Sequence, residues 1–82
     1  MSGRIEIDFA MAEGAVLRML GLIERRGFEV RGIAMAERGG QGSLALDVRP
    51  RDGGRRLEVI ASQLRRLHDV RQVSLSDRDS QQ

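Results

Sequence analysis

The sequence of 82 residues contains no cysteine, lysine, tryptophan or tyrosine, and only two phenylalanines and one histidine. The absence of cysteine excludes a disulfide scaffold and a thiolate metal site. No apolar run approaches the ~20 residues that a membrane-spanning helix needs. A chain this short, with so few aromatic side chains, can form only a thin hydrophobic core. We therefore expect a second subunit to contribute to its stability.

The charge balance also excludes function classes. Fourteen arginines stand against twelve acidic residues, which gives a formal net charge of +2 at pH 7, yet the isoelectric point is about 10.9. Because the chain lacks lysine, tyrosine and cysteine, almost nothing titrates between mildly acidic and strongly alkaline pH. The net field is too weak to steer the chain onto DNA or a membrane, so neither is expected as a partner. The first residues show no signal peptide, and we expect a cytoplasmic protein.

Residue periodicity predicts four strands and two helices. Residues 4–9 alternate strictly, with Ile5, Ile7 and Phe9 on one face, as in a strand with one face in water. Residues 14–26 place apolar side chains at helical spacing, and Gly27 suits the left-handed position after the helix. The remaining expected elements are a strand over 28–37, a turn over 39–42, a strand over 43–49, a loop over 50–54, a helix over 55–67 and a strand over 70–76. Val30 and Ile33 are out of phase in the strand over 28–37, so Gly32 marks either a bulge or a close approach of another backbone.

This order, βαββαβ, is typical of the α+β ferredoxin-like sandwich. Right-handed crossovers place both helices on one face of a four-stranded antiparallel sheet. Residues 1–76 are expected to form one domain, and residues 77–82 a polar, disordered tail.

The sequence offers little that could catalyse a reaction. There is one histidine, His68, and no paired carboxylates in an expected cleft, so we expect no catalytic residues, no metal site and no cofactor. An acylphosphatase-like site needs an asparagine, and the chain has none. The strand faces expected to be in water carry no aromatic residue for stacking on RNA bases.

One loop has the character of a ligand site. Residues 12–15 join the first strand to the first helix and contain Gly14, where a ligand can approach the backbone closely. The start of a helix also exposes free N–H groups that suit a carboxylate. Alternatively, Gly14 serves only as a turn residue.

Three stretches of the sequence resemble the ACT domain of the small regulatory subunit of acetohydroxyacid synthase (acetolactate synthase). They are Glu13-Gly14-Ala15-Val16-Leu17-Arg18-Met19-Leu20-Gly21-Leu22, Arg26-Gly27-Phe28-Glu29-Val30, and Gln63-Leu64-Arg65-Arg66-Leu67-His68-Asp69-Val70-Arg71-Gln72-Val73. The resemblance extends over nearly the whole chain, and is to the short, single-domain type.

The resemblance implies a non-catalytic subunit that forms homodimers by joining two sheets side by side. It also implies that the chain binds and activates a catalytic large subunit, which depends on thiamine diphosphate, in branched-chain amino-acid biosynthesis. An amino-acid effector would lie at the dimer interface. The candidate effector-binding residues are Met11, Ala12, Glu13, Gly14, Ala15, Leu17, Ile33 and Met35.

Three positions depart from the pattern of valine-responsive members. Met11 and Glu29 stand where those members have asparagine, and Leu17 stands where a small serine is usual. A methionine cannot hydrogen-bond an ammonium or carboxylate as an amide does, so we expect weak valine binding or none. Two alternatives stay open, a free-standing amino-acid-sensing ACT domain that regulates another enzyme and a nucleic-acid-binding module.

Overall fold

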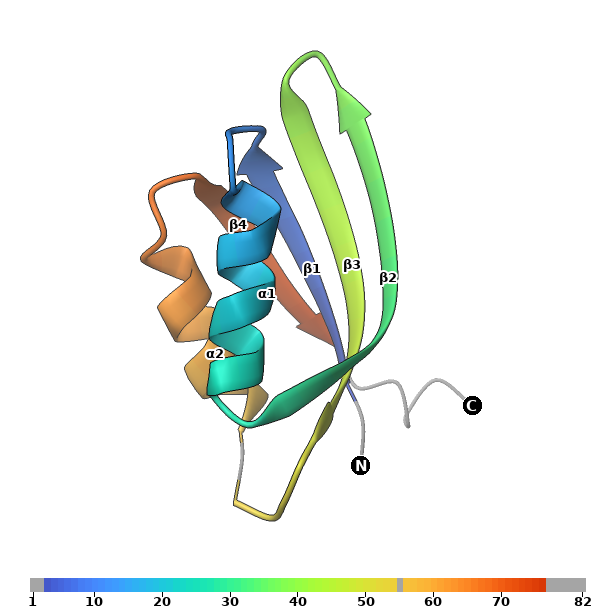
Figure 1. The fold of residues 1–82 in the computed structure, drawn as a ribbon, viewed down its shortest axis with the longest axis vertical. Helices are drawn as coiled ribbons and strands as arrows, with labels where there is room; N and C mark the ends of the chain where they lie inside the picture. Colours follow the sequence, from blue (N-terminus) through green and yellow to red (C-terminus); the bar gives the residue numbers. More distant parts are fainter. Residues whose placement is uncertain (1–2, 55, 77–82) are drawn as a thin grey trace.

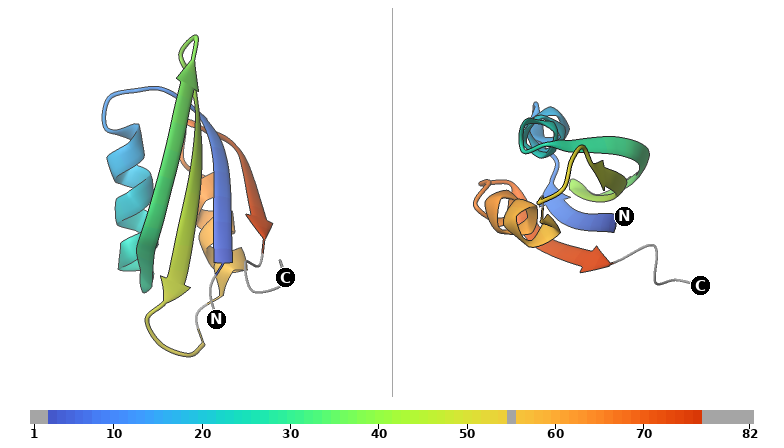
Figure 2. Two further views of the ribbon diagram at one scale, coloured as in Figure 1. Left: turned by 90° about the vertical axis from the view of Figure 1, so that its right-hand side faces the viewer. Right: turned by 90° about the horizontal axis from the view of Figure 1, so that it is seen from below.

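The computed structural model describes residues 3–54 and 56–76, which form the expected βαββαβ order. The elements are β1 (Gly3–Ala10), α1 (Ala15–Arg25), β2 (Phe28–Arg38), β3 (Gln41–Pro50), α2 (Leu57–Arg65) and β4 (Val70–Ser76). The strands form one antiparallel sheet in the order β2-β3-β1-β4. Both helices lie on the same side of this sheet (Figures 1 and 2). The predicted ferredoxin-like fold is therefore confirmed.

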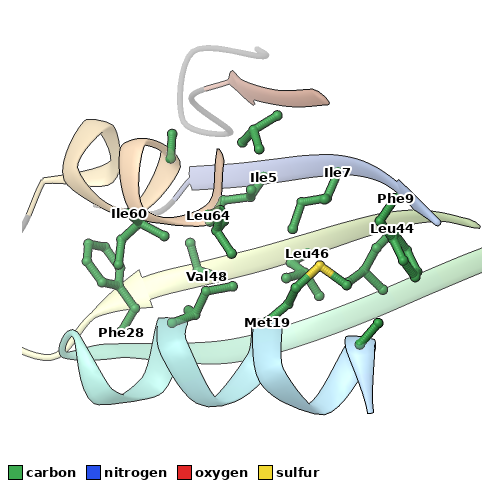
Figure 3. Close-up of a cluster of buried hydrophobic side chains, with 14 residues drawn as sticks. Ile5, Ile7, Phe9, Met19, Phe28, Leu44, Leu46, Val48, Ile60 and Leu64 are labelled. Carbon is green, nitrogen blue, oxygen red and sulfur yellow. The ribbon is translucent and has the colours of Figure 1, made fainter. Parts of the chain in front are cut away.

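The core lies between the helices and the sheet. Ile5, Ile7 and Phe9 of β1 are buried, as their alternation predicts. Figure 3 shows Met19 of α1 reaching toward Leu44 and Leu46 of β3. The remaining buried side chains come from α1, β2, β3, α2 and β4: Ala15, Ile23, Phe28, Val48, Ile60, Ala61, Leu64 and Val73.

Glycines set both ends of α1. Gly14 precedes α1 with φ of 78°, and Gly27 follows the helix with φ of 93°. Both conformations lie in the left-handed region, which glycine adopts without a steric penalty. The predicted role of Gly27 is confirmed.

The bulge in β2 is also confirmed, because the β2–β3 register shifts between Val30 and Gly32. The extra residue brings the apolar side chains that follow it back to the face of the sheet on which Val30 lies. Val30 pairs with Val48 and Ile33 pairs with Leu46, so both side chains lie on the side of the sheet that faces the helices. Without the extra residue, Ile33 would fall on the opposite side.

Some predicted boundaries were wrong. The turn is confined to Gly39 and Gly40, whereas Gln41 and Gly42 belong to β3. Gly42 is buried because its position lies against Phe9. Pro50 ends β3 rather than beginning a loop, and α2 is shorter than predicted, since its last turn gives way to the connection into β4. Arg55 and the predicted tail over 77–82 lie outside the described residues.

Candidate functional site

The candidate site starts from the loop between β1 and α1. Gly14 is the N-terminal cap residue of α1, and no side chain caps the helix there. Its left-handed backbone turns the chain so that the Ala15 N–H donates to Ala12 O at 3.0 Å and the Arg18 N–H donates to Gly14 O at 2.9 Å. Ala12 and Glu13 are exposed, while Ala15 is buried. Ala12 and Glu13 thus lie at the surface while Ala15 anchors the loop in the core.

Two backbone hydrogen bonds fix the loop to other parts of the fold. The Met11 N–H donates to Gly40 O at 2.9 Å, which attaches the loop to the turn between β2 and β3. The Ala10 N–H donates to Asp69 O at 2.8 Å, which attaches the end of β1 to the connection between α2 and β4. The loop is therefore held from both sides by residues distant in the sequence.

Arg18 completes this arrangement. Its Nη2 lies 2.6 Å from Asp69 Oδ2, and its Nη1 donates to Glu13 O at 3.2 Å. A Cβ built on Gly14 would lie 3.0 Å from Arg18 Nη1. The guanidinium therefore lies across the loop, bound to Asp69 at one end and to a loop carbonyl at the other. A charge-assisted hydrogen bond of this kind is stronger than one between neutral groups.

Met11 packs inward instead of toward a ligand. Its side chain is half-buried against the core, and its Sδ would lie 3.0 Å from a Cβ built on Gly42. The absence of a side chain at Gly42 thus gives room to Met11 and to the ring of Phe9.

The other candidate residues are exposed apolar side chains. Leu17 on α1 is 74% exposed, and Ile33 and Met35 on β2 are 57% and 49% exposed. Ile33 and Met35 pair with Leu46 and Leu44 and so share the helix side of the sheet. The β2–β3 hairpin extends past the ends of the helices (Figure 1), and nothing in the described chain covers these two side chains fully.

Of the predicted site residues, those over 11–15 form one loop. Leu17 follows this loop as an exposed position on α1, and Ile33 and Met35 are exposed positions on β2 for which no contact with the loop is seen within the described residues. Sequence reasoning missed Asp69, Gly40 and Gly42 as supports of the loop. Their role depends on contacts between segments far apart in the chain, and no local pattern marks them.

No helix in residues 3–54 and 56–76 is long and apolar enough to cross a membrane. Within the same residues, no group of three His, Asp or Glu side chains lies close enough together to hold a metal ion.

Solved structures share this fold at low sequence identity. The ACT domain of GTP pyrophosphokinase from Chlorobium tepidum is 18% identical, with a TM-score of 0.77 over 93% of this chain and 97% of its own. The acetolactate synthase small subunit from Thermotoga maritima is 22% identical, with a TM-score of 0.77 over 95% of this chain and 48% of its own. The C-terminal domain of the MgtC protein from Mycobacterium tuberculosis is 16% identical, with a TM-score of 0.74 over 99% of this chain and 90% of its own. At these identities the likeness establishes the fold alone.

No curated protein matches the sequence significantly. The ACT domain family, however, matches residues 11–73, which include the loop, both helices, β2, β3 and most of β4. The chain belongs to the ACT domain family.

Proposed function

We propose that this ACT domain is the non-catalytic regulatory subunit of acetohydroxyacid synthase, and that it binds and activates the catalytic large subunit, which depends on thiamine diphosphate. The ion pair between Arg18 and Asp69 carries the proposal. It joins the first and third of the stretches that resemble this subunit. The second stretch contains Gly27, whose left-handed backbone ends α1. The first and third of the resembling stretches thus supply the ion pair that holds the candidate site, and the second supplies the glycine that ends α1.

The experiment is to co-express the chain with a large subunit from the same source and to measure acetolactate formation and co-purification. We expect the two chains to purify together and the rate to rise. An unchanged rate without co-purification would contradict the proposal. The alternative, an ACT domain that senses an amino acid for another enzyme, predicts instead a calorimetric signal for an amino acid with the isolated chain.

We also propose that the chain works as a homodimer joined along β2. This strand is at the edge of the sheet, and its residues from Ile33 to Arg38 are exposed. An exposed edge with apolar side chains favours pairing with another strand. Antiparallel pairing centred on Ala34 would set Ile33 of one copy opposite Met35 of the other, which covers both apolar side chains.

Light scattering tests the dimer. The wild-type mass should be that of two chains, and Ile33→Glu should give the mass of one because it places two carboxylates in the apolar centre of the interface. Ser62→Glu, on the exposed face of α2, is the matched control and should remain dimeric. A wild-type monomer at high concentration would contradict the proposal.

Valine regulation is proposed to be weak or absent. The Met11 side chain packs against Gly42 of β3, and the bulky apolar side chain of Leu17 lies exposed next to the loop. Neither side chain can hydrogen-bond the ammonium or carboxylate of an amino acid. Activity of the reconstituted enzyme should therefore change little when valine is added.

A further inference from the structure

The outer face of the sheet, on the side away from the helices, contains a hollow that the proposed dimer and the candidate effector site leave unused. The register pairs Ala34 with Ala45 and Ala36 with Ser43. On the other side of β3, Ala45 pairs with Glu6 and Ser43 pairs with Asp8 of β1. These six residues line a depression of about 350 Å³. We call it the outer trough.

The trough continues toward the β2–β3 turn. A second hollow of about 620 Å³ shares Asp8, Ala36 and Ser43 with it, and reaches Arg38 and Gln41. The two depressions therefore form one open groove along the outer face of β2, β3 and β1.

The small side chains of the trough do not stabilise this chain by themselves. Alanine is depleted in strands, where β-branched and aromatic residues pack better on the pleated surface. Pairs of larger side chains across neighbouring strands stabilise a sheet more than an alanine pair does. Ala34, Ala36 and Ser43 are exposed, so burial in this chain does not require their small size. Small size at adjoining positions does allow a second surface to come close to the sheet.

The charge along one side of the trough is negative. Glu6 and Asp8 are exposed along β1. Arg4 Nε lies 3.3 Å from Glu6 Oε2, whereas Asp8 forms no ion pair with any residue in 3–54 or 56–76. The cross-strand neighbours of Asp8 are Ser43 and Gln72, which are both neutral. The net charge of the chain is +2, so the acidic border is a local feature and does not reflect the overall charge. Its negative charge is complementary to a cation.

We propose that the outer trough docks a segment of the catalytic large subunit that carries a bulky apolar side chain beside a lysine or arginine. The apolar side chain lies over Ala34, Ala36 and Ala45, and the cation pairs with Asp8. This inference rests on the proposed function, since it names the surface by which the regulatory chain reaches its partner. Pairing of two copies along β2 leaves this face open and brings the two troughs toward each other across the dimer axis.

Ser43→Arg tests the trough, because it fills the groove and places a cation beside Asp8. Ser43 is on an inner strand, so the substitution leaves the β2 edge intact, and the mass by light scattering checks this. Truncating or blocking an important interface contact costs ~1 kcal/mol or more, so we expect the Kd for the large subunit to rise at least about fivefold. Asp8→Asn should also weaken binding and reduce its dependence on salt concentration.

Ser62→Arg is the matched control, because it adds the same side chain to the exposed face of α2. The proposal is supported when wild type and Ser62→Arg bind and activate equally while Ser43→Arg, still dimeric, binds weakly. Equal binding by all three would overturn the trough as the docking surface and leave the proposed function standing. A wild-type chain that does not bind the large subunit would overturn both.

Discussion

Replacing Gly42 by alanine should destabilise the protein through a steric conflict with Phe9. A Cβ at this position would lie 2.6 Å from Phe9 Cζ, 2.9 Å from Phe9 Cε1 and 3.0 Å from Met11 Sδ. The Phe9 ring is fully buried, so it must shift against its neighbours in a close-packed core. Overpacking of this kind typically costs ~1–3 kcal/mol. The loss of backbone freedom in the unfolded chain returns ~0.4–1 kcal/mol.

The net expectation for Gly42→Ala is a loss of about 1–2 kcal/mol in the free energy of unfolding. For a domain of this size, that corresponds to a fall in Tm of roughly 4–16 °C. Chemical denaturation and thermal melting at a fixed protein concentration measure both quantities. A fixed concentration matters because the proposed dimerisation would make the apparent stability depend on it.

A double-mutant cycle separates steric conflict from other causes. Phe9→Leu removes the ring atoms that the new Cβ meets, so the loss caused by Gly42→Ala should shrink by at least about 0.5 kcal/mol in the Phe9→Leu background. Gly40→Ala is the control. Gly40 has a φ of 83° and nothing within 4 Å of a built Cβ, so its cost comes from backbone strain and should add independently to Phe9→Leu. Additive behaviour of Gly42→Ala with Phe9→Leu would refute the steric explanation.

Three further predictions concern the loop, the dimer and the effector. Asp69→Asn should lower the free energy of unfolding by no more than ~1 kcal/mol, because Arg18 is half exposed and water screens the pair. This loss should decrease in high salt, and a loss that does not depend on salt would contradict an electrostatic role. Ala34→Cys should form an intermolecular disulfide under mild oxidation, since the proposed register sets this residue opposite its own copy and the chain has no other cysteine. The control Ser62→Cys should not form one, and equal cross-linking of both variants would contradict the register. Met11→Asn combined with Leu17→Ser should increase valine binding measured by calorimetry, because it restores amide and hydroxyl groups beside the loop; an unchanged titration would show that these two positions do not limit binding.

Most of the fold followed from local patterns in the sequence. Strict alternation in residues 4–9 marked β1 and its buried face, because a strand between water and a core requires that period. Gly32 marked the bulge, since Val30 and Ile33 are out of phase in a regular strand. Both features depend on residues close together in the chain, so a single sequence contains them.

The role of Gly42 could not be predicted in the same way. Glycine occurs at three of the four positions from 39 to 42, and nothing local distinguishes a glycine that needs a left-handed backbone from one that gives room to another side chain. Gly39 and Gly40 are of the first kind, with positive φ. Gly42 instead gives room to another side chain, because Phe9 lies opposite it on the neighbouring strand.

The candidate site was predictable only in part for a related reason. Gly14 marks the loop from its own position before a helix, but the sequence does not show that Arg18 reaches Asp69. Ile33 and Met35 are exposed in the single chain, and the part proposed for them in a site requires a second copy. A pattern within one chain cannot give a contact that forms only between two chains.

The supports of the loop bear on how regulation can change in this protein. The position of the loop is set by the Met11 and Ala10 backbone hydrogen bonds and by the Arg18–Asp69 pair, and none of these needs an effector. Side chains that would recognise an amino acid can therefore be replaced without loss of the fold, provided that position 11 still fills the space over Gly42. The proposed docking through the outer trough uses the opposite face of the sheet from the loop. Under these proposals, binding of the catalytic subunit and sensing of an effector use different surfaces, which agrees with the proposed activation without a response to valine.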